Sequence, residues 1–194
     1  YGDHRDLHLS LRRQRQMCIR DRYYIDDLMF LPAPCDEAII ENCSNVVQDY
    51  NIISDWNCQQ NYGIETTVPI VLNPLISCDN RSEYVGEYTD NGTEAYDAFI
   101  LNYGSIINLN THNKLKFKLH SSSSIQVLVK LEGGSAIEKW SDFSAVNTWQ
   151  EFSYDFSDSI DNENTTLVLF FNAGQNNGNP EDIYYIDELR WEEN

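Results

Sequence analysis

Apolar and polar residues alternate along short stretches of this chain, and turn-forming residues separate the stretches. The clearest is KLKFKLH, residues 114–120, where Leu115, Phe117 and Leu119 fall on one side of an extended strand and lysines fall on the other. SIQVLVKL follows a serine run that can turn the chain, which predicts a hairpin between Leu115 and Leu131. TTLVLFF is almost continuously apolar, as is typical of a central strand covered on both sides.

Helical periodicity is not convincing in any stretch of a dozen residues after Val46. Further strand candidates are TVPIVL, SEYVGEY, YDAFILNY, TWQEFSYDF and IYYIDELRW. About nine strands with Gly, Asn, Asp and Ser turns between them favour an all-β fold, a jelly-roll β-sandwich more than a barrel.

A short internal repeat divides the chain. YYIDDLMF, residues 23–30, resembles YYIDELRW, residues 184–191, as tandem modules do. We therefore interpret residues 23–31 as the terminal strand of a truncated upstream module. The prolines of LPAPC indicate a linker over residues 32–44, and residues 45–194 are predicted to form one complete module.

The charge distribution sets the first 22 residues apart. The whole chain has a formal net charge of −18, yet six of its 13 basic residues lie in this leader. SLRRQRQMCIRDR resembles translated adaptor sequence from metagenomic assemblies, so we exclude residues 1–22 from fold reasoning as a non-native leader; a solvated basic tail is the alternative. The acidic remainder argues against nucleic acid as a partner, and no apolar run is long enough to insert into a membrane.

Five cysteines lack the paired spacing of a zinc site. With Cys18 set aside in the leader, four remain, which suits disulfides in an oxidising compartment. The local pairings are Cys35 with Cys43 and Cys58 with Cys78; buried free thiols are the alternative.

The order of several short motifs carries a family resemblance. SDWNCQQNYG, VGEYTDNGTEAYDAFILNYGS, VLVKLEGG, NTWQEFSYDFS, LVLFFNAG and YYIDELRW occur in this order between Ser54 and Trp191. The series resembles galactose-binding-like jelly-roll modules of secreted Bacteroidetes glycan-utilisation proteins. The resemblance implies non-catalytic carbohydrate binding, beside a glycoside hydrolase or in a surface-anchored multimodular chain.

An acidic residue in the terminal strand is the candidate metal ligand. Strict alternation places Asp187 on one face with Tyr185, Leu189 and Trp191, where a carboxylate is costly unless it is paired, hydrogen-bonded or bound to a cation. The resemblance implies a structural Ca²⁺ where the last strand meets the first, and Asp55 and Asn57 could supply further oxygen ligands. Hydrogen bonds from backbone amides to Asp187 are the alternative.

A sugar-binding site needs an exposed aromatic platform with polar side chains beside it. Trp140 lies in polar surroundings, which favours a surface position. Tyr88 and Tyr96 flank the loop TDNGTEA, whose polar members could meet sugar hydroxyls. The candidate carbohydrate-binding residues are therefore Tyr88, Asp90, Asn91, Glu94, Tyr96 and Trp140.

Catalytic patterns are weak in this sequence. His112 and His120 lie in or beside a lysine-rich strand without the partners of a nucleophile and its base. We therefore predict a secreted or cell-surface polysaccharide-binding module, linked covalently to neighbouring modules, that is not an enzyme. The alternative is a structural or adhesive spacer that binds no sugar, and solvated charged faces with buried rings would favour it.

Overall fold

The computed structural model describes residues 35, 37–90, 92, 94–175 and 182–194. They belong to one compact unit, Cys35–Asn194. The predicted leader, residues 1–22, and the predicted upstream strand, residues 23–31, lie outside the described residues.

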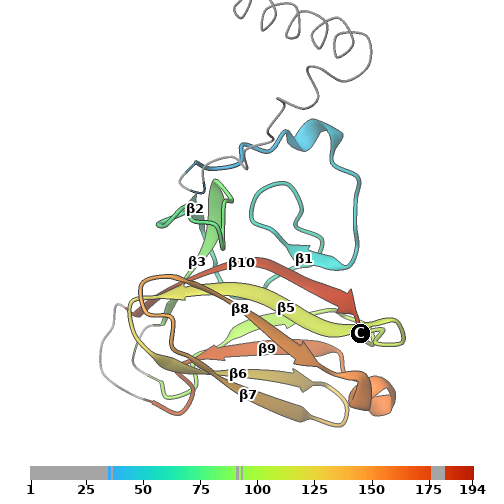
Figure 1. Ribbon diagram of the computed structural model, residues 1–194. Helices are drawn as coiled ribbons and strands as arrows, with labels where there is room; N and C mark the ends of the chain where they lie inside the picture. The colour runs from blue at the N-terminus through green and yellow to red at the C-terminus, as the bar shows by residue number, and fades with distance from the viewer. Residues whose placement is uncertain (1–34, 36, 91, 93, 176–181) are drawn as a thin grey trace, which may run out of the picture. The chain divides into compact units, whose positions relative to one another are not determined.

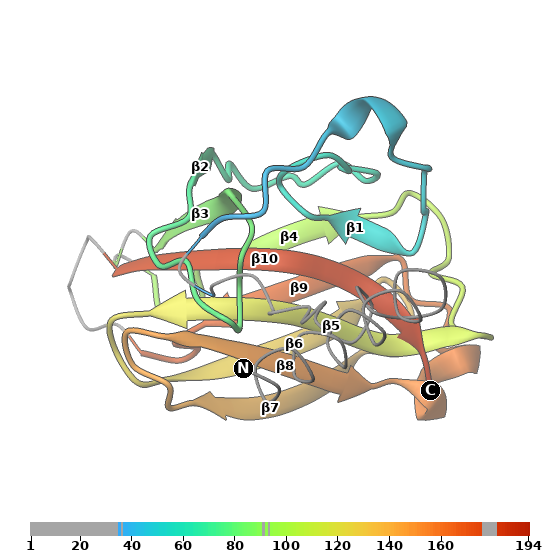
Figure 2. The same cartoon turned by 45° about the horizontal axis from the view of Figure 1, so that its top comes forward.

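The unit is a sandwich of two antiparallel sheets, which Figures 1 and 2 show as stacked layers. The first sheet has the order β2-β3-β10-β5-β8, with β1 paired to β10, and the second has the order β4-β9-β6-β7. The strands are β1 (Ile52–Ser54), β2 (Ile70–Leu72), β3 (Tyr84–Asp90), β4 (Phe99–Asn102), β5 (His112–Ser121), β6 (Ile125–Glu132), β7 (Ile137–Phe143), β8 (Trp149–Asp155), β9 (Thr166–Phe171) and β10 (Asp182–Glu193).

The prediction of an all-β sandwich is confirmed, with ten strands in the described residues where about nine were expected. Two 3-10 turns, η1 (Cys43–Asn45) and η2 (Ser157–Asn162), are the helical elements of this part of the chain. No helix within the described residues is long and apolar enough to cross a membrane.

The core lies between the sheets and follows from the alternation along the strands. In β5, Leu115, Phe117 and Leu119 are fully buried, and the Phe117 ring stacks on Phe152 of β8 with 5.2 Å between centroids. β9 lies between β4 and β6 and is buried on both faces along most of its length, as its continuous apolar character predicts.

The predicted hairpin between Leu115 and Leu131 is wrong. β5 pairs with β10 and β8 in one sheet, whereas β6 pairs with β7 and β9 in the other. The serine run therefore carries the chain across the sandwich from one sheet to the other. A polar, turn-forming run does not by itself distinguish a hairpin from such a crossing.

Strict alternation also fails in β10, because the strand contains a bulge. Its register against β5 shifts between Asp187 and Arg190, and Glu188 has a φ of 49° in the left-handed region. Tyr184 and Ile186 reach the core before the bulge, and Leu189 and Trp191 reach it afterwards. Asp187 therefore does not share a face with Leu189 and Trp191, since the extra residue changes which side chains point inward.

Two disulfides tie the N-terminal part of the unit to the sandwich, with pairings that differ from the local ones. Cys35 bonds to Cys78, and Cys43 bonds to Cys58. The Ile39 amide also donates to the Arg81 carbonyl at 2.7 Å. The compact unit begins at Cys35, inside the segment that the sequence presented as a linker. One disulfide holds that segment against the loop before β3, and the other holds it against the turn after β1.

Candidate functional site

A row of large apolar side chains crosses the outward face of the second sheet. Trp140 of β7 and Phe170 of β9 both pair in register with Leu128 of β6, so the three lie side by side. The Tyr96 ring packs edge-on against Phe170, with 6.1 Å between ring centroids. We call Tyr96, Phe170, Leu128 and Trp140 the aromatic row.

The row is distinct from the core and partly open to solvent. Leu128 is only 3% exposed, yet it does not belong to the buried cluster between the sheets. Trp140 and Tyr96 are 48% and 62% exposed. With a strand spacing of about 4.8 Å, and with Tyr96 beyond Phe170, the row spans roughly 15 Å. This length exceeds one sugar ring, so the row offers a platform for part of a chain.

Polar side chains border the row on both sides. Gln126 of β6 faces Asp142 of β7, with 3.4 Å between Nε2 and Oδ1. On the opposite side of Leu128, Lys130 makes ion pairs with Glu132 at 2.7 Å and with Glu138 at 3.4 Å. An apolar strip between amide and carboxylate groups matches the needs of a ligand with C–H faces and a rim of hydroxyls.

Of the six candidate carbohydrate-binding residues, the structure brings two together at this face. Trp140 and Tyr96 lie at opposite ends of the aromatic row. Glu94 is exposed in the loop that carries Tyr96. Asn91 lies outside the described residues.

Tyr88 and Asp90 are not surface groups. Tyr88 is 3% exposed and belongs to the core, where its ring packs against Phe171 at 5.4 Å. Asp90 is buried at the end of β3 and accepts a hydrogen bond from the Gly92 amide at 2.8 Å, which closes the following turn. Its pKa is raised, first by burial and further by the neighbouring carboxylates of Asp97 and Asp182. We conclude that Tyr88 packs in the core and that Asp90 stabilises the turn after β3, so neither is a sugar-binding residue of the aromatic row.

Sequence reasoning missed Leu128 and Phe170, although a signal was present. In IQVLVKLE, Leu128 occupies a position whose parity matches Gln126 and Lys130, so an apolar residue points to the polar side. In TLVLFF, Val168 and Phe170 do the same. Apolar residues at outward positions of adjacent strands indicate a platform, once the register that aligns them is known.

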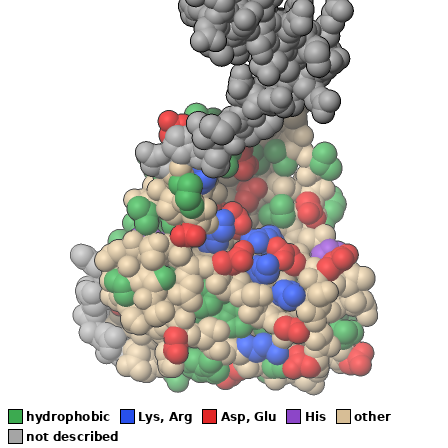
Figure 3. All heavy atoms as spheres, viewed as in Figure 1, with side chains coloured by type: hydrophobic (Ala, Val, Ile, Leu, Met, Phe, Trp, Pro, Cys, Tyr) green, Lys and Arg blue, Asp and Glu red, His purple; other side chains and the backbone are tan. Residues whose placement is uncertain are grey.

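The outward face of the first sheet has a different character. Figure 3 shows acidic and basic side chains intermingled over this side of the molecule. The side chains that make ion pairs there come from β5, β8 and β10, and we call them the charged face: Lys116, Lys118, Glu151, Glu188, Arg190 and Glu192. Arg190 alone contacts three carboxylates at 2.8–3.0 Å. Basic and acidic groups satisfy one another here, so the face offers few free groups to a ligand.

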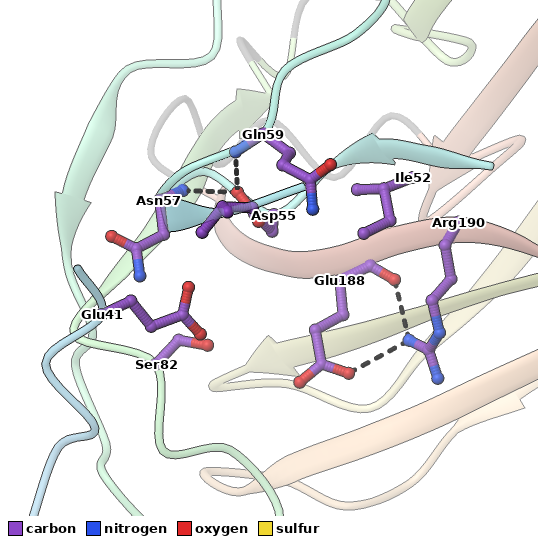
Figure 4. A pocket seen from close by; sticks show the side chains of 9 residues that line it. Glu41, Ile52, Asp55, Asn57, Gln59, Ser82, Glu188 and Arg190 are labelled. Carbon is purple, nitrogen blue, oxygen red and sulfur yellow. Dashed lines mark hydrogen bonds and ion pairs between the residues drawn. The ribbon is translucent and has the colours of Figure 1, made fainter. Parts of the chain in front are cut away.

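A cavity of about 280 Å³ lies beside β10 and contains two of the predicted metal ligands (Figure 4). Asp55 Oδ1 accepts hydrogen bonds from the backbone amides of Asn57, Cys58 and Gln59 at 2.8–2.9 Å. Glu188, on the opposite wall, is paired with Arg190 and Lys118. The pKa of Glu41 is raised, mainly by burial and next by the charge of Asp55.

Asp187 is fully buried and surrounded by hydrogen-bond donors. Asn80 Nδ2 donates to its Oδ2 at 2.8 Å, the Glu188 amide donates to its Oδ1 at 2.7 Å, and the Ser82 side chain also hydrogen-bonds to it. Burial raises the pKa of Asp187 to about 7 in spite of these donors. Three hydrogen-bond donors therefore surround this carboxyl group.

The predicted calcium ligands do not fit a calcium ion as they are arranged. Calcium requires six to eight oxygen ligands, whereas the groups that contact Asp187 and Asp55 Oδ1 are mainly N–H donors. Within the described part of the chain, no three His, Cys, Asp or Glu side chains gather as a metal site. The arrangement instead matches the alternative in which Asp187 is held by hydrogen bonds.

Comparison with known proteins gives fold-level similarity. No family model and no curated protein matches the sequence. Among solved structures, an exo-β-agarase has a TM-score of 0.53 at 11% identity, covering 74% of this chain and 24% of the agarase. A family 11 carbohydrate-binding module of Clostridium thermocellum, in complex with a β-1,3-1,4-mixed-linked tetrasaccharide, has a TM-score of 0.49 at 13% identity, covering 74% and 95% of the two chains.

SGBP-B, from a xyloglucan utilisation locus of Bacteroides uniformis, has a TM-score of 0.49 at 13% identity, covering 75% of this chain and 50% of that one. The solved structures that resemble this chain thus include carbohydrate-binding modules, and the agarase, with the TM-score above 0.5, shows a fold shared over 74% of this chain.

Proposed function

We propose that this protein is a non-catalytic carbohydrate-binding module that holds a polysaccharide against the aromatic row. The observation that carries the proposal is the alignment of Trp140, Leu128 and Phe170 in register on an outward face, with Tyr96 extending the row. Aromatic rings stack on the apolar faces of sugars, and bordering amide and carboxylate groups bind hydroxyls. The fold shared with carbohydrate-binding modules supports this use of the face.

A spacer without a ligand is the rival function. A spacer needs no exposed aromatic side chains aligned across strands, and apolar patches on a monomer frequently have a function. The charged face is compatible with a spacer as well as with a binding module, so it does not distinguish the two functions. The aromatic row therefore favours binding.

The cavity beside β10 does not lead us to propose a hydrolase. Glycoside hydrolysis requires one carboxyl group as an acid and another as a nucleophile or base. Glu41 has a raised pKa, but Asp55 is occupied by backbone amides and Glu188 by two cations. The remaining carboxylates of the cavity are thus committed to structural interactions.

We propose that the module works outside the cell, in a secreted or surface-attached multimodular protein. The two disulfides support this location, because such bonds form and persist in oxidising compartments. Attachment to a glycoside hydrolase and a Bacteroidetes source are parts of the same proposal, and they rest on the sequence resemblance.

The test is a binding screen of the full 194-residue chain against soluble β-glucans, xylan, mannan and galactans by isothermal titration calorimetry. We expect binding to one class of polysaccharide, and a loss of about tenfold or more in affinity for Trp140→Ala, since one stacking ring contributes on the order of 1 kcal/mol or more. Tyr50→Ala is the control, because Tyr50 is an aromatic residue 70% exposed outside the row. A folded protein that binds none of these glycans would favour the spacer.

A further inference from the structure

Acidic side chains dominate the surroundings of the aromatic row. The structure describes all four strands of the second sheet. Their outward positions include the acids Glu132, Glu138 and Asp142, and Lys130 is the one basic residue among these positions. A ligand that lies along the row therefore meets a face with a net negative charge.

The positive charge of Lys130 is already neutralised. Its ammonium group lies 2.7 Å from Glu132 and 3.4 Å from Glu138, between two carboxylates. Recognition of carboxylate or sulfate groups uses Arg or Lys side chains that can pair with the ligand. An anionic ligand would have to displace these two pairs before it could use Lys130.

The Tyr96 end of the row is acidic as well. Glu94 is exposed in the same loop, and Asp97 follows Tyr96 directly in the sequence. The carboxylates of Asp97 and Asp182 also lie near enough to Asp90 to raise its pKa, after the larger effect of burial. Asp97 and Asp182 thus lie with Asp90 of the first sheet, and exposed Glu94 is the acid that adds negative charge near the Tyr96 end of the row.

The basic residues with ion pairs in the first sheet do not change this balance. Lys116, Lys118 and Arg190 point to the outward side of the opposite sheet and are bound to acids there. Lys139 of β7 pairs with Asp158 and lies over the Phe156 ring, on the side that does not carry the row.

From this distribution we propose that the aromatic row accepts an uncharged glycan and rejects glycans that carry carboxylate or sulfate groups. This inference rests on the proposed function and names the substrate class of the same face. The aromatic rings of the row stack on the sugar. The sugar hydroxyls donate hydrogen bonds to the bordering carboxylate and amide oxygens, and the same carboxylates repel anionic polymers.

The test compares neutral and anionic polymers that share a backbone. The probes are hydroxyethyl cellulose with carboxymethyl cellulose, desulfated with native sulfated galactan, and fully methyl-esterified with de-esterified homogalacturonan. The full chain should bind the neutral member of at least one pair and bind its charged partner at least about tenfold more weakly at low salt. Added salt should narrow this gap by screening the repulsion, while neutral binding stays constant.

The outcomes separate the two proposals. Equal or tighter binding of the charged member would overturn the inference about charge and leave carbohydrate binding intact. Binding to neither member of any pair, together with no binding in the screen of β-glucans, xylan, mannan and galactans, would overturn the proposed function itself.

A charge reversal tests the cause directly. Glu138→Lys should strengthen binding to the charged member of the pair, because it removes one acid from the border of the row and adds a cation. Asp161→Lys makes the same change at an exposed position of η2 and should leave the gap unchanged. An unchanged ratio of the affinities for neutral and charged polymer in a folded Glu138→Lys variant would contradict the proposal. If that variant does not fold, the salt dependence of binding by the parent protein decides.

Discussion

The two outward faces of this sandwich are made of similar antiparallel strands but carry opposite kinds of side chain. On β5, the outward positions include Lys116 and Lys118, each of which makes an ion pair with a carboxylate of β10. On β6, the outward positions include Leu128, which lies between an aromatic residue on each side. A fold needs only one apolar side per sheet to form its core, so the second apolar strip indicates a function beyond stability.

The largest effect that we expect is on binding, and it should occur on one face alone. Trp140→Ala combined with Tyr96→Ala should weaken glycan binding on the order of hundredfold, because the variant loses the exposed rings at both ends of the row. Lys116→Ala combined with Lys118→Ala changes the charged face and should leave the affinity within about twofold. Calorimetric titration of both variants measures the difference, and equal losses would show that the faces do not differ in function.

Stability should distinguish the faces next. Leu128→Ala removes a buried side chain and should lower the free energy of unfolding by about 2–3 kcal/mol, whereas Lys118→Ala removes a partly exposed ion pair and should cost less than about 1 kcal/mol. Urea denaturation followed by tryptophan fluorescence compares the two variants. A smaller loss for Leu128→Ala than for Lys118→Ala would show that the row contributes little to the fold.

The pH should affect stability through the first sheet. Asp187 has a pKa near 7 in the folded protein and 3.8 as its ordinary value, so the folded state binds the proton more tightly. The free energy of unfolding should therefore fall as pH rises from about 4 to about 7, by at most about 1.4 kcal/mol per pH unit from this group. Denaturation curves across this range should show a flatter slope for Asp187→Asn.

An identical slope in Asp187→Asn and the parent protein would place the pH dependence elsewhere. The Asp142→Asn variant makes the same substitution at an exposed position of the other sheet and is the control.

The smallest effect that we expect concerns metal. Donors surround Asp187 and Asp55, so removal of divalent cations with EDTA should leave the melting temperature unchanged within about 1 °C. Thermal denaturation with EDTA and with added calcium is the measurement. A clear rise in melting temperature on adding calcium would restore calcium as a ligand of this fold.

The strands were predictable from the sequence where alternation is regular on both faces. KLKFKLH predicts the inward and outward sides of β5 correctly, because each residue obeys a period of two. The same rule fails in β10, since the bulge at Glu188 inserts a residue that no local pattern announces. Tyr88 was assigned to the surface because the sequence around β3 does not show which of its sides faces the core.

The features that depend on distant partners could not be predicted in this way. Cys35 finds Cys78, and not the nearer Cys43, because the fold brings the loop before β3 to the start of the unit. Trp140 and Tyr96 were recognisable as exposed aromatic residues, but Leu128 and Phe170 join them only through strand register. Register between strands is a long-range property, and one sequence shows each strand alone.

The most direct test of glycan binding by the aromatic row is NMR. A neutral oligosaccharide of the polysaccharide class that binds is titrated into the full chain, and the changes in amide chemical shift are mapped onto the structure. The largest changes should fall on Gln126, Leu128, Trp140 and Phe170, in β6, β7 and β9. Changes confined to Lys116, Lys118 and Arg190 on the opposite sheet, with none along the row, would contradict this assignment of the binding face.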